Sequence, residues 1–197
     1  MFSGITEGIG KIIDYTDKSI KIKSDDRIIN GLSVGDSIAI NGVCLTVVEI
    51  ELQNYSFVVN ISHETRKKTN LDLVNQSIVN IEQSKKIGDR LHGHIVQGHI
   101  DGMGELKSIE KKGDFFDFEF LVPNEILSYI IEKGSVTVNG VSLTVNECSS
   151  LGFKVTVIPY TFSETNFKFL TLGNKVNIEV DVIGKYVKHF LGNKVDK

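Results

Sequence analysis

The sequence predicts an all-β protein of two tandem, similar, six-stranded antiparallel β-barrels followed by a short C-terminal helix. Three observations carry this prediction: a long internal duplication, six short runs of strand character in each copy, and helical periodicity confined to two short segments. A length of 197 residues suits two small domains. A copy of about 95 residues can bury a modest core without metals or disulfides.

The duplication is clearest in one block, Ser37–Val47 (SIAINGVCLTV), which returns as Ser135–Val145 (SVTVNGVSLTV). The pairs that recur in the same order around it are Gly4, Gly8 and Gly10 with Gly98, Gly102 and Gly104; Thr65, Thr69 and Asn70 with Thr161, Thr165 and Asn166; and Val79–Glu82 with Val176–Glu179. The offset runs from 94 residues (Gly4 to Gly98) to 98 residues (Asn41 to Asn139). This is far longer than the ~20–50 residues of a solenoid unit. The chain therefore duplicates a whole domain.

Each copy contains six runs of alternating or β-branched residues. In the first copy they lie near 8–14, 19–23, 37–40, 43–50, 55–61 and 77–82; in the second they lie near 102–109, 115–121, 135–138, 141–148, 152–158 and 175–181. Asn41-Gly42 predicts a tight turn between two of these strands, because both residues tolerate positive φ. Six short strands are best accommodated by closing into a barrel, which removes exposed edges. We expect barrels over residues 1–94 and 95–182.

Helical periodicity is limited to two segments. Pro123–Ile131 begins with a proline suited to a first helical turn and has apolar residues at helical spacing. In the tail, residues 183–197, one apolar stripe is formed by Ile183, Tyr186, Val187, Phe190 and Leu191. A helix this short is not stable alone, so we expect it to pack on its own barrel or on a partner's tail.

Composition excludes several classes of protein. A net charge of −3 gives no nucleic-acid footprint, and Lys85-Lys86 and Lys111-Lys112 are typical of solvated loops. No apolar run approaches the ~20 residues of a membrane span, and no signal peptide is visible. Cys44 and Cys148 do not correspond across the repeat, so no disulfide framework is predicted. A cytoplasmic location is the simplest expectation.

The segment that joins the copies, Leu91–Gly102, holds His92, His94 and His99. A metal site is one interpretation, but no carboxylate or thiol stands at ligand spacing and the first copy has Ile5 where the second has His99. We therefore predict no metal. Cys44 on an alternating strand is more typical of a small core residue than of a nucleophile. Gly4–Gly10 lacks the spacing of a dinucleotide-binding loop.

Several motifs together resemble one family. They are Met1–Ile5 (MFSGI), Asn41–Val47 (NGVCLTV), Gly93–Gly102 (GHIVQGHIDG), Asn139–Val145 (NGVSLTV) and Val176–Asp181 (VNIEVD). In combination they are similar to riboflavin synthase of the α-chain type, which has two lumazine-binding repeats. The resemblance covers essentially the whole chain.

The resemblance implies a transferase that dismutates two molecules of 6,7-dimethyl-8-ribityllumazine. One molecule donates a four-carbon unit to the other, which gives riboflavin and 5-amino-6-ribitylaminopyrimidinedione, the last step of riboflavin biosynthesis. The family uses no metal or redox cofactor. A homotrimer held partly by C-terminal helices is implied as well, with lumazine synthase as a further partner to consider and no nucleic-acid or membrane partner.

The family's substrate-binding positions are carried over in two groups. The first pocket is expected to use Gly4, Ile5, Thr6, Cys44, Leu45, Thr46, Asn60, Ile61, Ser62, His63, Glu64 and Thr65. The second is expected to use Gly98, His99, Ile100, Lys133, Ser142, Leu143, Thr144, Thr156, Val157, Ile158, Pro159, Tyr160 and Thr161. Backbone groups and hydroxyls at strand ends suit the polar edge of a small heterocycle.

The implied reaction needs a proton removed from a ring methyl group and a nucleophile added to the adjacent ring carbon. His99 is the candidate for proton transfer. Cys44 or Ser142 is the candidate to assist the nucleophile, and Asp181 is the candidate to position one of these groups. Holding two substrates face to face can supply ~7–11 kcal/mol through orientation alone.

Two other functions stay open at this stage. Lumazine- and flavin-carrying fluorescent proteins share the double barrel and bind without catalysis. A flavin-reductase-type barrel is a third alternative, although no nicotinamide-binding domain follows. The copies match at Asn41/Asn139, Leu45/Leu143, Thr46/Thr144 and Thr65/Thr161 but differ at Ile5/His99, Cys44/Ser142 and Glu64/Tyr160. Pockets alike in recognition and unlike in a few polar groups favour the dismutating enzyme.

Overall fold

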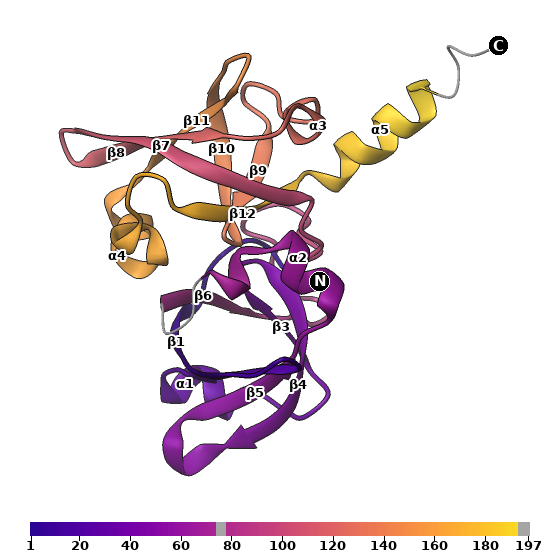
Figure 1. Cartoon of the computed structure of the whole chain (residues 1–197), viewed down its shortest axis with the longest axis vertical. Helices are drawn as coiled ribbons and strands as arrows, with labels where there is room; N and C mark the ends of the chain where they lie inside the picture. The colour runs from indigo at the N-terminus through magenta and orange to yellow at the C-terminus, as the bar shows by residue number, and fades with distance from the viewer. Residues whose placement is uncertain (74–77, 193–197) are drawn as a thin grey trace.

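The computed structural model describes residues 1–73 and 78–192 and contains two closed six-stranded antiparallel barrels, one above the other (Figure 1). The first barrel has the strand order β1-β2-β5-β4-β3-β6. Its strands are β1 (Gly8–Tyr15), β2 (Ser19–Lys23), β3 (Ser37–Ile40), β4 (Val43–Glu51), β5 (Ser56–Asn60) and β6 (Ile78–Gln83). The predicted fold class is therefore confirmed.

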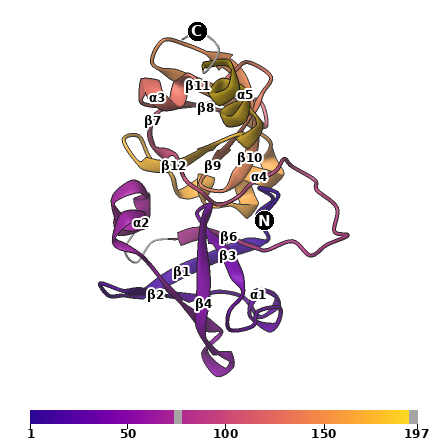
Figure 2. The same cartoon turned by 90° about the vertical axis from the view of Figure 1, so that its right-hand side faces the viewer.

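The second barrel repeats this topology. Its strands are β7 (Gly102–Lys112), β8 (Phe115–Leu121), β9 (Ser135–Val138), β10 (Val141–Cys148), β11 (Gly152–Val157) and β12 (Lys175–Val180). Their order, β10-β11-β8-β7-β12-β9, is the order of the first barrel once each strand is replaced by its counterpart. The predicted strands match the observed ones closely; the predicted first residue of β6, residue 77, lies outside the described residues. The connection between the barrels, residues 84–101, includes a loop that projects to one side of them (Figure 2).

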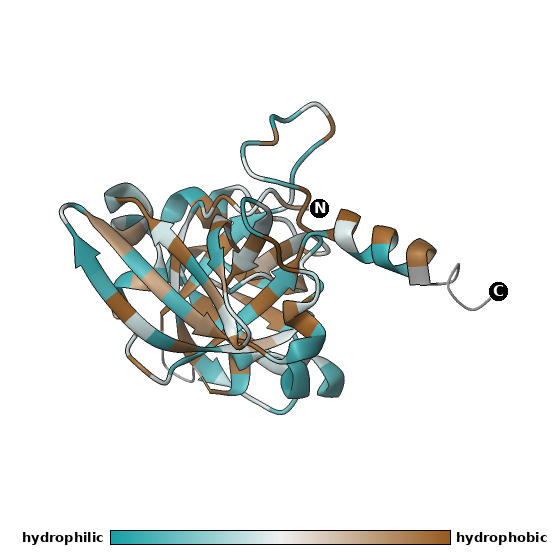
Figure 3. Ribbon diagram, turned by 90° about the horizontal axis from the view of Figure 1, so that it is seen from above, coloured by the Kyte–Doolittle hydropathy of each residue, from teal (hydrophilic) through white to brown (hydrophobic). Residues whose placement is uncertain are grey.

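The helices agree less well with the sequence. The predicted helix over Pro123–Ile131 is wrong in length, because α3 covers only Asn124–Leu127. The chain then turns toward Lys133, whose φ of 62° is incompatible with a continuing helix, while Ile130 enters the core. The short helices that hydrophobic periodicity could not show are α1 (Asp26–Asn30), α2 (His63–Lys68), α4 (Pro159–Glu164), and the 3₁₀ turns η1 (Leu52–Asn54), η2 (Asn70–Asp72) and η3 (Asn166–Phe169). The C-terminal helix α5 (Val182–Gly192) is present as predicted and projects away from the barrels (Figure 3).

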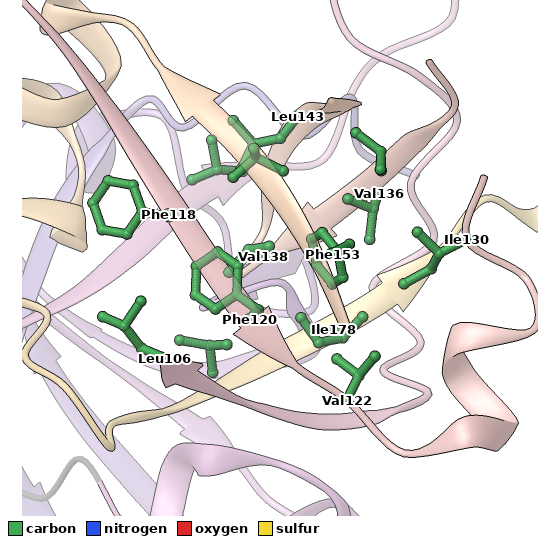
Figure 4. Packing of buried hydrophobic residues seen from close by; sticks show 14 of the residues in the cluster. Leu106, Phe118, Phe120, Val122, Ile130, Val136, Val138, Leu143, Phe153 and Ile178 are labelled. Atoms are coloured by element: carbon green, nitrogen blue, oxygen red, sulfur yellow. The ribbon is translucent and has the colours of Figure 1, made fainter. Parts of the chain in front are cut away.

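Each barrel encloses its own apolar core, because alternate strand residues point inward. The second core is rich in aromatic residues, with Phe118, Phe120 and Phe153 grouped inside the barrel (Figure 4). The Phe118 ring meets Phe167 of η3 edge to face at 5.0 Å between centroids, so the chain after α4 closes one end of the barrel.

The two barrels meet where their equivalent turns touch. Asn41-Gly42 and Asn139-Gly140 have matching φ values of 47° and 79°, as the Asn-Gly signal predicts. A Cβ added to Gly42 would lie 2.7 Å from the Gly140 nitrogen, and one added to Gly140 would lie 2.6 Å from the Gly42 nitrogen. Only glycine permits this close backbone approach on the pseudo-twofold axis.

Six buried asparagines surround this contact and form a hydrogen-bond network that obeys the same pseudo-symmetry: Asn41, Asn70, Asn80, Asn139, Asn166 and Asn177. Asn80 Nδ2 donates to the Asn139 carbonyl at 2.9 Å, and Asn177 Nδ2 donates to the Asn41 carbonyl at 2.9 Å. Buried amides with several partners fix one orientation. The Val-Asn-Ile-Glu repeat seen in the sequence thus supplies one asparagine to the interface from each barrel.

We expect Asn80→Ala to lower the free energy of unfolding by about 2–4 kcal/mol. The substitution leaves the Asn166 N–H and the Asn139 carbonyl without their partners, and a buried orphan costs about 1–3 kcal/mol. Denaturant unfolding measures the loss, with Asn146→Ala as the control because Asn146 is an exposed asparagine whose side chain donates to Thr156. Equal losses in the two variants would contradict a structural role for the network.

Candidate functional site

Two segments outside the barrels, called here the arms, cross from one barrel to the other. The first arm is residues 2–6 and the second is residues 96–100. They pair with each other through an antiparallel bridge, with Phe2 N–H to Val96 O at 2.8 Å and Val96 N–H to Phe2 O at 3.2 Å. Phe2 and Val96 are equivalent in the repeat, so the arms also lie on the pseudo-twofold axis.

Each arm meets the opposite barrel. The Cys44 N–H on β4 of the first barrel donates to the Gly98 carbonyl of the second arm at 2.9 Å. The Ser142 N–H on β10 of the second barrel donates to the Gly4 carbonyl of the first arm at 2.7 Å. The expected grouping is therefore wrong: Gly98, His99 and Ile100 belong with Cys44, and Gly4 belongs with Ser142. A duplicated sequence is equally compatible with either arrangement, so it could not show this exchange.

The first pocket is a cavity of about 280 Å³ between β4, α2 and the second arm. It is lined by Val43, Cys44, Glu64, Thr65, Lys68, Thr69, Gly98, His99 and Ile100. Ser62 accepts the Thr65 N–H at 3.1 Å and so begins α2, which places Glu64 and Thr65 at the cavity. Thiol, carboxylate, hydroxyl and imidazole groups of the predicted site converge here, although Val43, Lys68 and Thr69 were not predicted.

Glu64 and Lys68 form an ion pair of 3.0 Å one helical turn apart on α2. Both side chains are largely exposed, so the pair adds little stability. The pair instead affects position: Lys68 keeps the Glu64 carboxylate beside the cavity, where it can accept hydrogen bonds from hydroxyl groups of a ligand. In the second copy the same place on α4 is taken by the exposed Tyr160, which offers a single hydroxyl.

The second site centres on Ser142, and the structure adds a residue to which the sequence assigned no role. His94 Nδ1 lies 2.7 Å from Ser142 Oγ. Burial lowers the pKa of His94 below its ordinary value, and the nearby charge of Asp181 opposes this shift. His94 Nε2 is buried and has no hydrogen-bond partner among the described residues. A neutral imidazole that contacts a hydroxyl and carries a free nitrogen can accept or relay a proton.

Asp181 lies between β12 and α5, where its Oδ1 accepts the Ile183 N–H at 2.9 Å. It therefore has a structural role at the start of α5 as well as an electrostatic effect on His94. Lys133 is exposed on the loop before β9, and its N–H donates to Val145 O at 2.8 Å. The described contacts do not bring the Lys133 side chain to Ser142.

The other predicted residues are of three kinds. Core side chains, which leave only their backbone for a ligand, are Leu45, Ile61, Leu143 and Val157. Exposed side chains on strands are Thr46, Asn60 and Thr144, and those on the segments before and within α2 and α4 are His63, Ile158 and Pro159. The remaining partly buried or exposed residues are Ile5 and Thr6 on the first arm, Thr156, which contacts Asp117 at 2.5 Å, and Thr161 on α4.

Comparison with known proteins places this architecture. The family model for the lumazine binding domain matches residues 3–84 and 97–181, which are the two copies. Riboflavin synthase of Photobacterium phosphoreum is 42% identical over 97% of this chain and 89% of its own length. Riboflavin synthase of Bacillus subtilis is 39% identical over 97% of this chain and 90% of its own length. The chain belongs to the riboflavin synthase family.

Solved structures show the same fold. A crystal structure of LumP complexed with riboflavin is 25% identical, covers 91% of this chain and 99% of LumP, and has a TM-score of 0.82. A crystal structure of LumP complexed with 6,7-dimethyl-8-(1'-D-ribityl) lumazine is 23% identical with a TM-score of 0.81, which shows the shared fold. LumP and this chain thus share the double barrel.

Two further findings concern the described residues of this riboflavin synthase family member. They bring together no group of three or more His, Cys, Asp or Glu side chains suited to a metal ion. No helix within residues 1–73 and 78–192 combines the length and apolar character needed to cross a membrane.

Proposed function

We propose that this protein is a riboflavin synthase, a transferase that converts two 6,7-dimethyl-8-ribityllumazine molecules into riboflavin and 5-amino-6-ribitylaminopyrimidinedione. The observation that carries the proposal is a pair of sites, each formed by a barrel strand and the arm bonded to it. The two sites have the same backbone arrangement but different reactive side chains. One combines Cys44 with His99, and the other combines Ser142 with His94. A reaction in which identical molecules act as donor and acceptor needs two such sites.

The chemistry balances without an oxidant or reductant. The donor gives up four carbons and keeps its pyrimidine ring and ribityl chain, and the acceptor gains those four carbons as the new ring of riboflavin. His94 and His99 are the groups we assign to remove protons from ring methyl groups and to return protons to the donor nitrogens from which the four-carbon unit departs. Cys44 and Ser142 are the groups we assign to assist the nucleophile, and Glu64, Thr65 and the arm backbone to bind substrate.

We further propose a homotrimer assembled through α5. The side chains of Ile183, Tyr186, Val187, Phe190 and Leu191 are 51–62% exposed, and α5 borders a hollow of about 630 Å³ with Tyr129, Ile131 and Gly134. An apolar stripe of this kind on a projecting helix supports a protein partner. We place the working site between subunits, where the first barrel of one faces the second barrel of its neighbour. A cytoplasmic location and an association with lumazine synthase stay predictions.

The likeness to LumP keeps a non-catalytic carrier as the second candidate. The two candidates are separated by mixing purified protein with 6,7-dimethyl-8-ribityllumazine and following absorption and fluorescence. We expect conversion with one riboflavin formed for every two lumazines consumed. Tight binding of the lumazine without product would establish the carrier and contradict the enzyme.

A further inference from the structure

The Val-Asn-Ile-Glu motif of each copy ends in one buried glutamate. Glu82 on β6 and Glu179 on β12 are 4% and 1% exposed. Burial raises the pKa of both carboxyl groups, and the hydrogen bonds they accept oppose this shift. A carboxylate buried in this way needs hydrogen bonds or paired charges to compensate for its lost hydration.

The groups that they hold are backbone amides of the arms. Glu82 accepts the Ser3 N–H at 2.7 Å on Oε1 and the Gly4 N–H at 2.9 Å on Oε2, and the Ser3 hydroxyl adds a bond of 2.8 Å. Glu179 accepts the Gln97 N–H at 2.8 Å on Oε1 and the Gly98 N–H at 2.9 Å on Oε2. Each carboxylate therefore binds two successive amides with its two oxygens. A glutamine would point its own NH₂ group at one of those amides.

The same peptide segment continues to the opposite barrel. Gly98, held by Glu179 of the second barrel, accepts the Cys44 N–H of the first barrel through its carbonyl. Gly4, held by Glu82 of the first barrel, accepts the Ser142 N–H of the second barrel. The hydrogen bonds thus form a chain, called here a relay, that runs from the glutamate of one barrel, through an arm, to the strand of the other barrel that carries the candidate catalytic residue.

Cations support both carboxylates from nearby. Lys85 Nζ lies 3.8 Å from Glu82 Oε1 and also binds Glu7 at 2.8 Å. Lys185 opposes the rise in the pKa of Glu179, whereas Asp101, which binds Lys185 at 2.7 Å, contributes to that rise. The charged groups around the two glutamates thus differ, although the fork of amides is the same.

We propose that Glu82 and Glu179 are positioning residues, each holding an arm of its own barrel in the pocket of the opposite barrel. Glu179 sets the place of His99 beside Cys44, and Glu82 sets the first arm beside Ser142. The reaction that they serve is the one in the proposed function, on which this inference rests.

The test compares Glu179→Gln with Glu82→Gln in the full chain. The readout is the amide chemical shifts of Gly98 and Cys44 for one relay, and of Gly4 and Ser142 for the other, in protein labelled with ¹⁵N and without ligand. Glu179→Gln is expected to shift Gly98 and Cys44 while leaving Gly4 and Ser142 unchanged, and Glu82→Gln is expected to do the reverse. Glu110→Gln, an exposed glutamate paired with Lys112, is the control that should move none of them.

Turnover of 6,7-dimethyl-8-ribityllumazine is measured on the same samples. An arm displaced by about 1 Å is expected to lower kcat by about 10- to 100-fold. Glu179→Asp keeps the charge but is one methylene shorter, so it should fail to restore the fork and should behave like Glu179→Gln. If Glu179→Asp restores both shifts and kcat, charge alone acts and the positioning role is overturned.

Further outcomes also decide the question. Unchanged Gly98 and Cys44 shifts in a folded Glu179→Gln variant overturn the proposal. If Glu82→Gln does not fold, Ser3→Ala removes one of the three bonds to Glu82 and should shift Gly4 and Ser142 only; unchanged shifts there overturn it too. If the wild-type protein makes no riboflavin, the proposed function is contradicted. The amide shifts do not depend on turnover, so they still test whether the glutamates hold the arms.

Discussion

We expect His94→Ala to lower kcat for riboflavin formation by about 10²- to 10⁴-fold, the usual range for loss of a general acid or base, with little change in lumazine affinity. The expectation rests on the 2.7 Å contact between His94 Nδ1 and Ser142 Oγ and on the buried Nε2, which finds no hydrogen-bond partner in the described part of the chain. Steady-state kinetics and a fluorescence binding titration give kcat and Kd separately. His92→Ala, an exposed histidine of the same linker, is the matched control.

The pH profile provides a second test of the same residue. Burial lowers the pKa of His94, so the imidazole is neutral at neutral pH, and turnover should fall as pH drops through a value below about 6.5. The same lowered pKa means that neutral His94 stabilises the fold above its unfolded pKa, and that this stability is lost as pH falls through the folded pKa. His94→Ala should remove the acid limb of the profile. A limb that stays in place, or a Kd that rises as much as kcat falls, would assign His94 to binding.

The barrels could be predicted from the sequence because their signals are local. Alternating residues mark each strand, and Asn41-Gly42 and Asn139-Gly140 mark turns whose φ values only a few residues tolerate. The short helices α2 and α4 could not be predicted, because one turn and a half shows no periodicity. Their capping residue Ser62 and first-turn Pro159 were the signals available.

The site was only partly predictable, since its assembly depends on contacts between distant parts of the chain. Cys44 and His99 are named by the family pattern, but the sequence cannot show which barrel receives which arm. His94 lies in the linker, outside the aligned repeat, so comparing the copies does not reveal it. Only the fold brings it to Ser142.

The exchange of arms also changes how the two copies differ. With the arms assigned within their own barrels, Cys44 would stand with Ile5, and Ser142 would stand with His99. In the structure Cys44 shares a cavity with His99, and Ser142 contacts His94. Each site thus combines one imidazole with one side chain that differs between the sites, a thiol at Cys44 and a hydroxyl at Ser142, and burial lowers the pKa of the imidazole at Ser142. A thiol in one site and a hydroxyl in the other support distinct roles for the donor and the acceptor.

The second large effect is expected from Gly98→Ala, which should lower kcat by about 100-fold. Gly98 has φ of 79°, and a Cβ added there would lie 2.5 Å from Cys44 Cβ and 2.8 Å from the Cys44 nitrogen. Ordinary contacts of this kind begin at 3.4 Å, so either the arm or β4 must move by nearly an ångström. A displacement of that size can cost about 10²-fold when it separates groups that act together.

Gly173→Ala separates this displacement from backbone strain. Gly173 has φ of 85°, but an added Cβ would meet no atom of the described residues within 4 Å. Both alanines carry the left-handed strain of about 1–2 kcal/mol, so both should lower the unfolding midpoint. Only Gly98→Ala should also lower kcat and shift the Cys44 amide, because only that methyl group occupies the space of the opposite barrel. Comparable kcat values in the two variants would show that the arm can give way without disturbing the first pocket, and the chemistry would then have to depend on the site at Ser142 and His94.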